Sequence, residues 1–161
     1  MVRIGVVSDT HLTARGNLPA QLLEGLQGVD LILHAGDWVA LEVAWQLEAI
    51  APVEGVYGNN DGWDIRDKFG KEKIIRAGGR AIGLIHGDGR LPTVETAWSA
   101  FRDRGVDVII FGHSHAPHRE LREGVLLFNP GSPTQKRWQP HHSYGILEFG
   151  PDGIKAEHRF F

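Results

Sequence analysis

The segment VRIGVVSDTH, residues 2–11, decides the fold class of this chain. Its first six residues form a mostly apolar, β-branched run, and Asp9 and His11 follow that run directly. Short apolar runs bounded by glycine or polar residues are typical of buried strands. In open α/β sheets, the functional side chains lie in the crevice beyond the carboxyl ends of such strands. The segment therefore predicts a buried strand that delivers a carboxylate and an imidazole to a functional edge.

Four later segments repeat this arrangement. In each, a short apolar run leads into a side chain that can bind a metal: LILHAG before Asp37, VEGVYG before Asn59, AIGLI before His86, and VDVIIFG before His113 and His115. Singly, these residues also fit structural roles, since Asp37 can cap a helix and residues 58–62 have the composition of a turn. Five clusters at the same end of five predicted strands indicate one assembled metal site.

Helical patterns separate the early strands, and the end of the chain differs. Apolar residues at helical spacing predict helices over residues 18–26, 39–50 and 94–104. Thr93 is the expected N-cap of the last of these. The last third predicts strands around residues 118–122, 125–128, 144–149 and 154–161. Residues 60–69, 89–93 and 133–142 are expected to be loops above the site. No linker or repeat interrupts this order, so we expect residues 1–161 to form a single domain.

Composition restricts the class of protein. The 161 residues are 42% hydrophobic and 23% charged, which is ordinary for a globular protein of one-domain size. A net charge of −3 argues against binding nucleic acid or acidic membranes through overall charge. The absence of cysteine excludes disulfides and thiolate zinc sites. The sequence has neither a signal-peptide pattern nor a membrane-spanning run, and we expect a cytoplasmic protein.

The order of the motifs resembles that of the calcineurin-like metallophosphoesterases. The matching motifs are Asp9-x-His11, Gly36-Asp37, Gly58-Asn59-x-Asp61, His86-Gly87 and Gly112-His113-x-His115. The tail Asn129-Pro130-Gly131-Ser132 and the small size resemble the compact prokaryotic phosphodiesterase subgroup of that superfamily. The resemblance implies an α/β fold in which two mixed β-sheets pack as a sandwich flanked by helices, in four αββα layers.

The resemblance also implies a centre of two divalent metal ions. One ion would be held by Asp9, His11, Asp37 and His115. The other would be held by Asn59, His86 and His113, with the Asp37 carboxylate bridging both. Imidazoles with oxygen ligands and no thiolate suit transition metals better than Mg²⁺ or Ca²⁺. Manganese is favoured by family analogy, and Ni²⁺, Fe²⁺, Co²⁺ and Zn²⁺ fit the same ligands.

The implied activity is hydrolysis of phosphodiesters by in-line attack of a metal-bridging hydroxide, with Asp37, Asn59, His113 and Asp61 as the catalytic set. Asp61 is expected to orient His11 or Asn59, or to close its turn. The sequence departs from the better-known members at Asn60, where they carry a histidine that assists the leaving group. Because an amide cannot donate a proton as an acid, we expect either a preference for esters with acidic leaving groups or a metal-polarised water in place of the missing acid.

Other interpretations and residues remain open at this point. The alternatives are a phosphomonoesterase, a nuclease, or a noncatalytic protein-binding scaffold such as the retromer subunit of this fold. The expected partner is a small phosphate ester, and exposed late strands could support a homo-oligomer. Trp38, Trp63 and Trp138 either stack on an aromatic substrate group or cover the core. His34 either supports the site or is a buried, hydrogen-bonded histidine.

Overall fold

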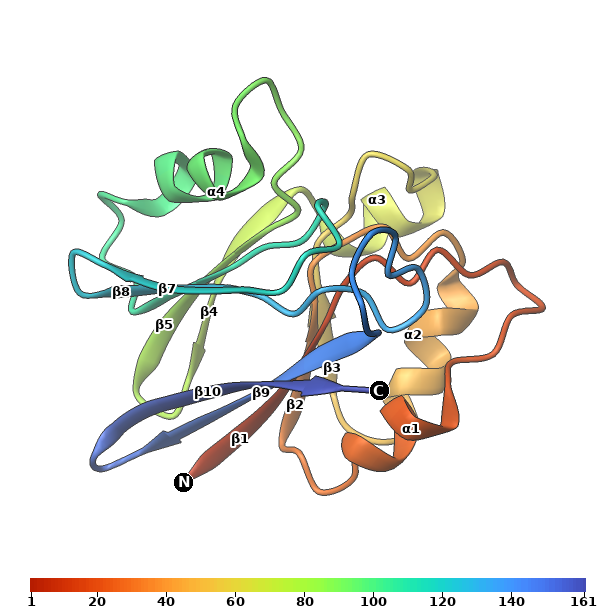
Figure 1. The fold of residues 1–161 in the computed structure, drawn as a ribbon, viewed down its shortest axis with the longest axis horizontal. Helices are drawn as coiled ribbons and strands as arrows, with labels where there is room; N and C mark the ends of the chain where they lie inside the picture. The colour runs from red at the N-terminus through yellow and green to blue at the C-terminus, as the bar shows by residue number, and fades with distance from the viewer.

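Ten strands form two mixed sheets of five strands each (Figure 1). The computed structural model describes residues 1–161. The first sheet has the order β10-β9-β1-β2-β3, with bounds β1 Val2–Val7, β2 Leu31–His34, β3 Val53–Gly55, β9 Ser143–Gly150 and β10 Gly153–Phe160. The second has the order β4-β5-β6-β8-β7, with bounds β4 Glu72–Ala77, β5 Arg80–Ile85, β6 Val108–Ile110, β7 His118–Arg122 and β8 Val125–Asn129.

Strand direction is the feature that positions the site. β1, β2 and β3 run parallel to one another, and so do β5, β6 and β8. The remaining neighbours pair antiparallel, including β9, which returns the end of the chain to lie beside β1. Each sheet therefore contains three neighbouring parallel strands whose carboxyl ends lie at the same end of the sheet; they are central in the second sheet and extend to the edge strand β3 in the first.

The sheets face each other across a shared apolar core, and helices cover their outer faces. In β1, Ile4 and Val6 pack between the sheets, whereas Val7 packs on the side of the first helices. In β5, Ile82 and Leu84 point into the same central core, whereas Ile85 faces outward. Since successive side chains of a strand point to opposite faces, continuous apolar runs are what a strand buried on both faces requires.

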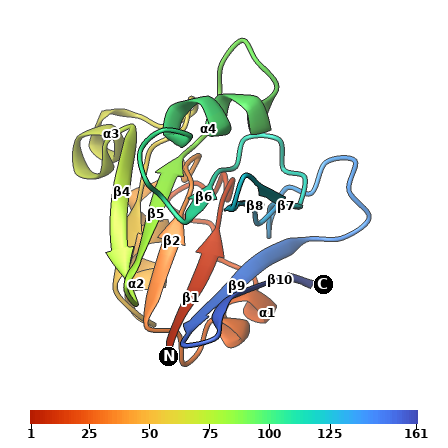
Figure 2. The same ribbon diagram turned by 90° about the vertical axis from the view of Figure 1, so that its left-hand side faces the viewer.

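Four helices complete the layers. Their bounds are α1 Ala20–Gly25, α2 Leu41–Glu48, α3 Trp63–Phe69 and α4 Thr93–Phe101. Side chains of α1, α2 and α3 join the core on the outer face of the first sheet, and those of α4 join the core on the outer face of the second. Figures 1 and 2 show α4 separated from α1 and α2 by the sheets. None of the helices is long and apolar enough to cross a membrane.

The predicted fold class is confirmed, with corrections to individual elements. All five early strands and all four late strands form, and the helices over residues 18–26, 39–50 and 94–104 are shorter than predicted. Residues 60–69 are not entirely a loop, because α3 occupies Trp63–Phe69. The sequence prediction also missed β4, an edge strand of the second sheet. Thr93 is not the N-cap of α4: Pro92 precedes the helix, and no side chain caps it.

Candidate metal centre

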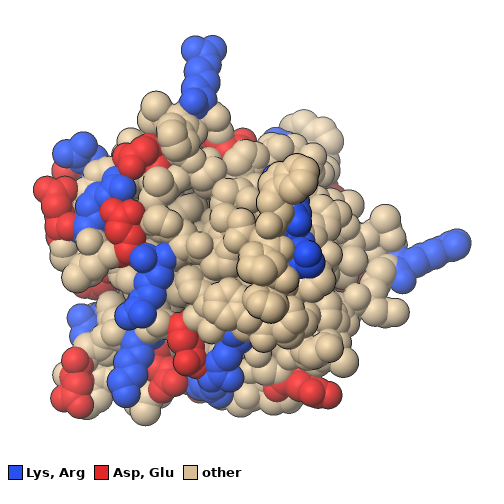
Figure 3. All heavy atoms as spheres, viewed as in Figure 1, with Lys and Arg blue, Asp and Glu red and all other residues tan.

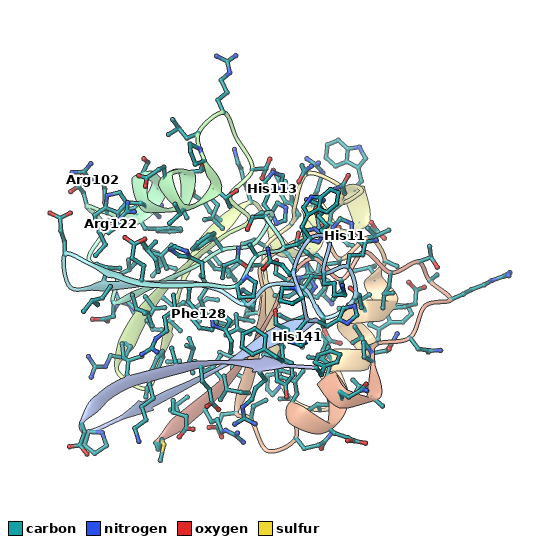
Figure 4. All side chains as sticks on the ribbon, viewed as in Figure 1. His11, Arg102, His113, Arg122, Phe128 and His141 are labelled. Carbon is teal, nitrogen blue, oxygen red and sulfur yellow. The ribbon has the colours of Figure 1, made fainter.

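The predicted ligand residues converge at one edge of the sandwich. They occupy the loops that follow β1, β2 and β3 in the first sheet and β5 and β6 in the second. Loops after neighbouring parallel strands meet at the same edge of a sheet, so residues far apart in sequence come together there. Figure 4 shows His11 and His113 close together among these loops, whereas Arg102 and Arg122 lie on the far side, beside α4.

Asp9, His11 and His115 form a first group that could hold a metal ion. Asp9 Oδ1 lies 3.4 Å from His115 Nε2 and 3.8 Å from His11 Nε2. All three atoms are buried, and none has a hydrogen-bond partner. Buried polar atoms without partners are rare in proteins. Three of them facing one another fit a cation between them, and carboxylate and imidazole are suitable ligands.

Asp37, His86 and His113 form a second such group. His86 Nε2 lies 3.3 Å from Asp37 Oδ2 and 3.3 Å from His113 Nδ1. Asn59 adds a neutral oxygen, since its Oδ1 is 3.1 Å from the same His86 nitrogen. His86 Nδ1 donates to the carbonyl oxygen of Ala35 at 2.8 Å, which turns Nε2 towards the site.

The Asp37 carboxylate faces both groups. Its Oδ2 lies 3.4 Å from His11 Nε2 and 3.3 Å from His86 Nε2. Asn60 holds this carboxylate, because its backbone N–H donates to Oδ1 and its side-chain amide donates to Oδ2, both at 2.9 Å. The structure thus brings together all seven side chains predicted as ligands: Asp9, His11, Asp37, Asn59, His86, His113 and His115.

The carboxylates and imidazoles of the cluster shift one another's pKa values. Burial would raise the pKa of Asp9 and of Asp37, but contacts from neighbouring imidazoles outweigh it and lower both pKa values. Asn60 also contributes to lowering the pKa of Asp37. Burial would lower the pKa of His86, but the contact with Asp37 and the charge of Asp9 raise that pKa to about 9. Two ionised carboxylates are therefore only partly balanced by one protonated imidazole, and a bound cation would supply the missing positive charge.

The backbone at the ligands has an unusual conformation. Five of the seven predicted ligand residues have φ between +47° and +69°: Asp9, His11, Asp37, His113 and His115. This left-handed region costs a non-glycine residue about 1–2 kcal/mol. Such conformations persist where surrounding contacts enforce them, and they cluster at functional sites.

Asp61 holds the Asp37 loop, which differs from the contact we expected. Its Oδ2 accepts hydrogen bonds from the backbone N–H groups of Asp37 at 2.9 Å and Gly58 at 2.8 Å. Its Oδ1 accepts the N–H of Val39 at 2.8 Å. The bond from Gly58 closes the turn, as expected, but no hydrogen bond of the carboxylate goes to His11 or Asn59. Burial and the charge of Asp37 raise the pKa of Asp61, although the backbone donors oppose them.

Three supporting contacts were not found from the sequence. Ser8 Oγ donates to Asp9 Oδ2 at 2.6 Å, and its only signal was its place beside Asp9. Thr134 Oγ1 donates to the carbonyl oxygen of Thr10 at 2.6 Å, and His115 Nδ1 donates to the carbonyl oxygen of Gln135. Thr134 and Gln135 lie far from these partners in the chain, and a backbone carbonyl has no sequence signature.

Close packing also restricts the site from the side of the second sheet. A Cβ atom on Gly112 would lie 2.0 Å from Ser8 Oγ and 2.6 Å from Asp9 Oδ2. Asn129 and Ser132 shape a turn nearby. Asn129 Oδ1 accepts the N–H of Gly131 at 2.9 Å, and Ser132 Oγ donates to the carbonyl oxygen of Asp9 at 2.8 Å.

Of the histidine and the tryptophans considered as site residues, two lie in the core and two lie on the surface. His34 is fully buried and hydrogen-bonded to Thr10 Oγ1 at 3.1 Å, and burial lowers its pKa to about 3. Trp38 is fully buried too, with its ring stacked 3.7 Å from that of His34, so it cannot reach a substrate. Trp63 and Trp138 are 86% and 96% exposed.

Charge on the surface forms no large patch of one sign on the face seen in Figure 3. Lys and Arg are interspersed there with Asp and Glu on the left of the view, and much of the right is uncharged. A nucleic-acid groove would need a continuous basic track. This face therefore gives no support to a nuclease.

Comparison with known proteins agrees with the family resemblance seen in the sequence motifs. Residues 2–152 match the calcineurin-like phosphoesterase superfamily domain. A protein of Methanothermobacter thermautotrophicus named "Probable metallophosphoesterase" is 38% identical over 141 residues, which cover 83% of this chain and 78% of that protein. A phosphodiesterase of Methanocaldococcus jannaschii is 29% identical over 142 residues, covering 81% of this chain and 83% of the relative. The crystal structure of a single mutant of Vps29 from Entamoeba histolytica is similar with a TM-score of 0.78 and 25% identity, over 99% of both chains.

Proposed function

The chain belongs to the calcineurin-like phosphoesterase superfamily, and from that premise we propose that it is a phosphodiesterase with a centre of two divalent metal ions. The family consists of metal-dependent phosphoester hydrolases, and the similarity to an archaeal phosphodiesterase favours diesters over monoesters. We propose that residues 1–161 act as one catalytic domain.

One observation carries this proposal: a single oxygen, Asp37 Oδ2, lies within 3.4 Å of one imidazole from each donor group. A carboxylate in that position can bridge two cations, as in two-metal phosphoryl-transfer sites. The first group adds three buried atoms without partners, a second reason to place a cation there. With imidazole and oxygen donors and no thiolate, the site suits manganese, nickel, iron, cobalt or zinc, and we propose manganese.

Two bound divalent ions would supply Lewis acidity, which activates the attacking water and neutralises charge on the phosphoryl group. The protein's own residues position that chemistry. Asp37, Asn59 and His113 would contact the ions directly, and Asp61 acts as a positioning residue through the backbone of Asp37. The amide of Asn60 is engaged with Asp37 and cannot act as an acid, which supports a preference for acidic leaving groups.

The experiment is a metal add-back assay on chelated protein. A chromogenic phosphodiester is compared with the matching monoester in the presence of each candidate ion. Asp37→Asn should abolish activity and reduce the occupancy of both ions, measured as metal content. Asp67→Asn, an exposed position on α3, is the matched control and should behave as wild type. Loss of only one ion in Asp37→Asn contradicts the bridging role.

The protein-binding scaffold remains the second candidate, because a Vps29 structure matches 99% of this chain. Binding of a partner protein does not require seven side chains that can bind metal to converge on one site, nor buried polar atoms without hydrogen-bond partners there. These features favour the enzyme. Absence of hydrolysis with every divalent ion, in protein of confirmed metal content, would favour the scaffold.

A further inference from the structure

A fully exposed tryptophan stands beside the metal centre. Trp138 is 96% exposed, whereas Trp38 is fully buried and Trp45 on α2 is 56% exposed. Tryptophan has the largest apolar surface of any side chain, so leaving it in water forgoes a large gain from burial. A solvent-exposed indole is typical of a surface that binds a ligand or a partner.

The loop that carries Trp138 is anchored to the site. Thr134 Oγ1 donates to the carbonyl oxygen of Thr10, between two ligand residues. The carbonyl oxygen of Gln135 accepts a hydrogen bond from the ring of the ligand His115. Three residues span at most about 11 Å of extended chain. The backbone of Trp138 is therefore within about 11 Å of the residue that contacts the ring of His115.

A tight turn presents the indole. The N–H of Gln139 donates to the carbonyl oxygen of Lys136 at 2.9 Å, and Lys136 Nζ donates to the carbonyl oxygen of Gln139 at 3.2 Å. Both bonds close the turn beneath Trp138. The exposed indole thus stands on an ordered turn of the backbone, and because its side chain has only two torsions it loses little conformational freedom when a ligand stacks on it.

Arg137 adds a positive charge and a hollow. Arg137 has a φ of +50°, a left-handed backbone conformation that few non-glycine residues of this chain adopt and that five of the proposed ligand residues share. A shallow, open hollow of the surface is lined by Arg137 and Trp138.

We propose that the hollow between Arg137 and Trp138 binds a planar aromatic group, a nucleobase or an aryl ring, on the ester arm that is not the leaving group. The indole face stacks on the ring, and the guanidinium donates to heteroatoms of a base or lies over its π-face. This inference rests on the proposed phosphodiesterase function and names the substrate class for it. Trp138 is then a specificity residue, remote from the bond that is broken.

The kinetic test uses three diesters that share a p-nitrophenol leaving group and differ in the other arm: methyl, phenyl and a 5′-nucleoside. Stacking on an aromatic residue corresponds to about a 5- to 150-fold effect on binding. Trp138→Ala should therefore lower kcat/KM by that factor for the phenyl or the nucleoside ester, mainly through KM, and leave the methyl ester unchanged. Trp138→Phe should restore most of the loss. Trp45→Ala, also an exposed tryptophan, is the control.

The ester that loses more identifies the source of the ring, nucleobase or aryl. An equal loss on all three esters, or none on the aromatic two, overturns the inference while the phosphodiesterase function stands.

A binding measurement separates the two proposals. Calorimetry compares AMP with ribose 5-phosphate on manganese-loaded wild type and Trp138→Ala. AMP should bind more tightly than ribose 5-phosphate to wild type only, by the same 5- to 150-fold factor. If wild type hydrolyses no diester but this difference persists, the proposed function fails and the aromatic site remains. If AMP and ribose 5-phosphate bind wild type alike, the inference is wrong.

Discussion

Replacing Asp61 by asparagine tests how the Asp37 loop is held. The carboxylate accepts three backbone N–H bonds, from Asp37, Gly58 and Val39. If the amide oxygen of asparagine takes the place of Oδ2, two bonds remain, and the NH2 group then faces the N–H of Val39. One hydrogen bond to a charged acceptor is lost, at about 1.5–3 kcal/mol. Val39 is also β-branched with φ of +77°, so its conformation depends on that bond.

One effect opposes this loss. Burial and the charge of Asp37 raise the pKa of Asp61, so a neutral side chain is easier to bury there. We therefore expect a net cost of about 2 kcal/mol. For a chain of this length, that lowers Tm by about 4–8 °C.

The assay is thermal unfolding of chelated protein, followed by circular dichroism, so that metal affinity does not enter the result. Asp67→Asn makes the same chemical change at an exposed position and should leave Tm unchanged. The reasoning is refuted if Asp61→Asn unfolds at the same temperature as that control. Manganese titration of both variants should then show weaker binding in Asp61→Asn alone, because Asp37 loses one of its supports.

Three further predictions concern the site and its surroundings. Gly112→Ala should displace Asp9 and reduce metal content, because the new Cβ would lie 2.6 Å from Asp9 Oδ2. Gly150→Ala is the control, since the space around Gly150 is open. Equal metal content in the two variants would contradict the packing argument. His34 has a pKa of about 3 when folded against about 6.5 when unfolded, so acidification destabilises the folded state. From pH 8 to 5 the stability of wild type relative to His34→Gln should fall by about 2 kcal/mol in urea titrations, and a constant difference would show that His34 does not stay neutral. Manganese at about 100 times its Kd should stabilise chelated wild type by about 2.7 kcal/mol, seen as a rise in Tm that Asp37→Asn lacks; an equal rise in both would place the ion elsewhere.

The strand ends were predictable because each carries its own local signal. An apolar run followed by a polar ligand residue marks both the strand and the direction in which it points, as in residues 2–11. Helix α3 was missed because only Ile65 and Phe69 are buried along it, and two apolar residues make a weak helical pattern. β4 was missed because it is an edge strand whose residues are at most partly buried.

The contacts around the ligands could not be predicted in this way. Asp61 was expected to orient His11 or Asn59, or to close its turn. It closes the turn through Gly58, but its further bonds go to the backbone N–H groups of Asp37 and Val39, and backbone groups carry no sequence signal. The separation into two sheets came from the resemblance alone. Nothing in the periodicity of β1 or β5 says that they belong to different sheets.

The path of the chain through the site has a consequence for how the protein is made. The N–H of His113 bonds to the Asp9 carboxylate across 104 residues, and Ser132 reaches the backbone of Asp9 across 123. During synthesis on the ribosome, Asp9 therefore cannot form these hydrogen bonds until His113 and Ser132 have been made. β9, which pairs with β1, is synthesised later still. Contacts of such long range form late, since closing the intervening loops costs entropy. The proposed metal site is therefore complete only after most of the chain has been made, and an arrested or truncated product would lack part of its ligand set.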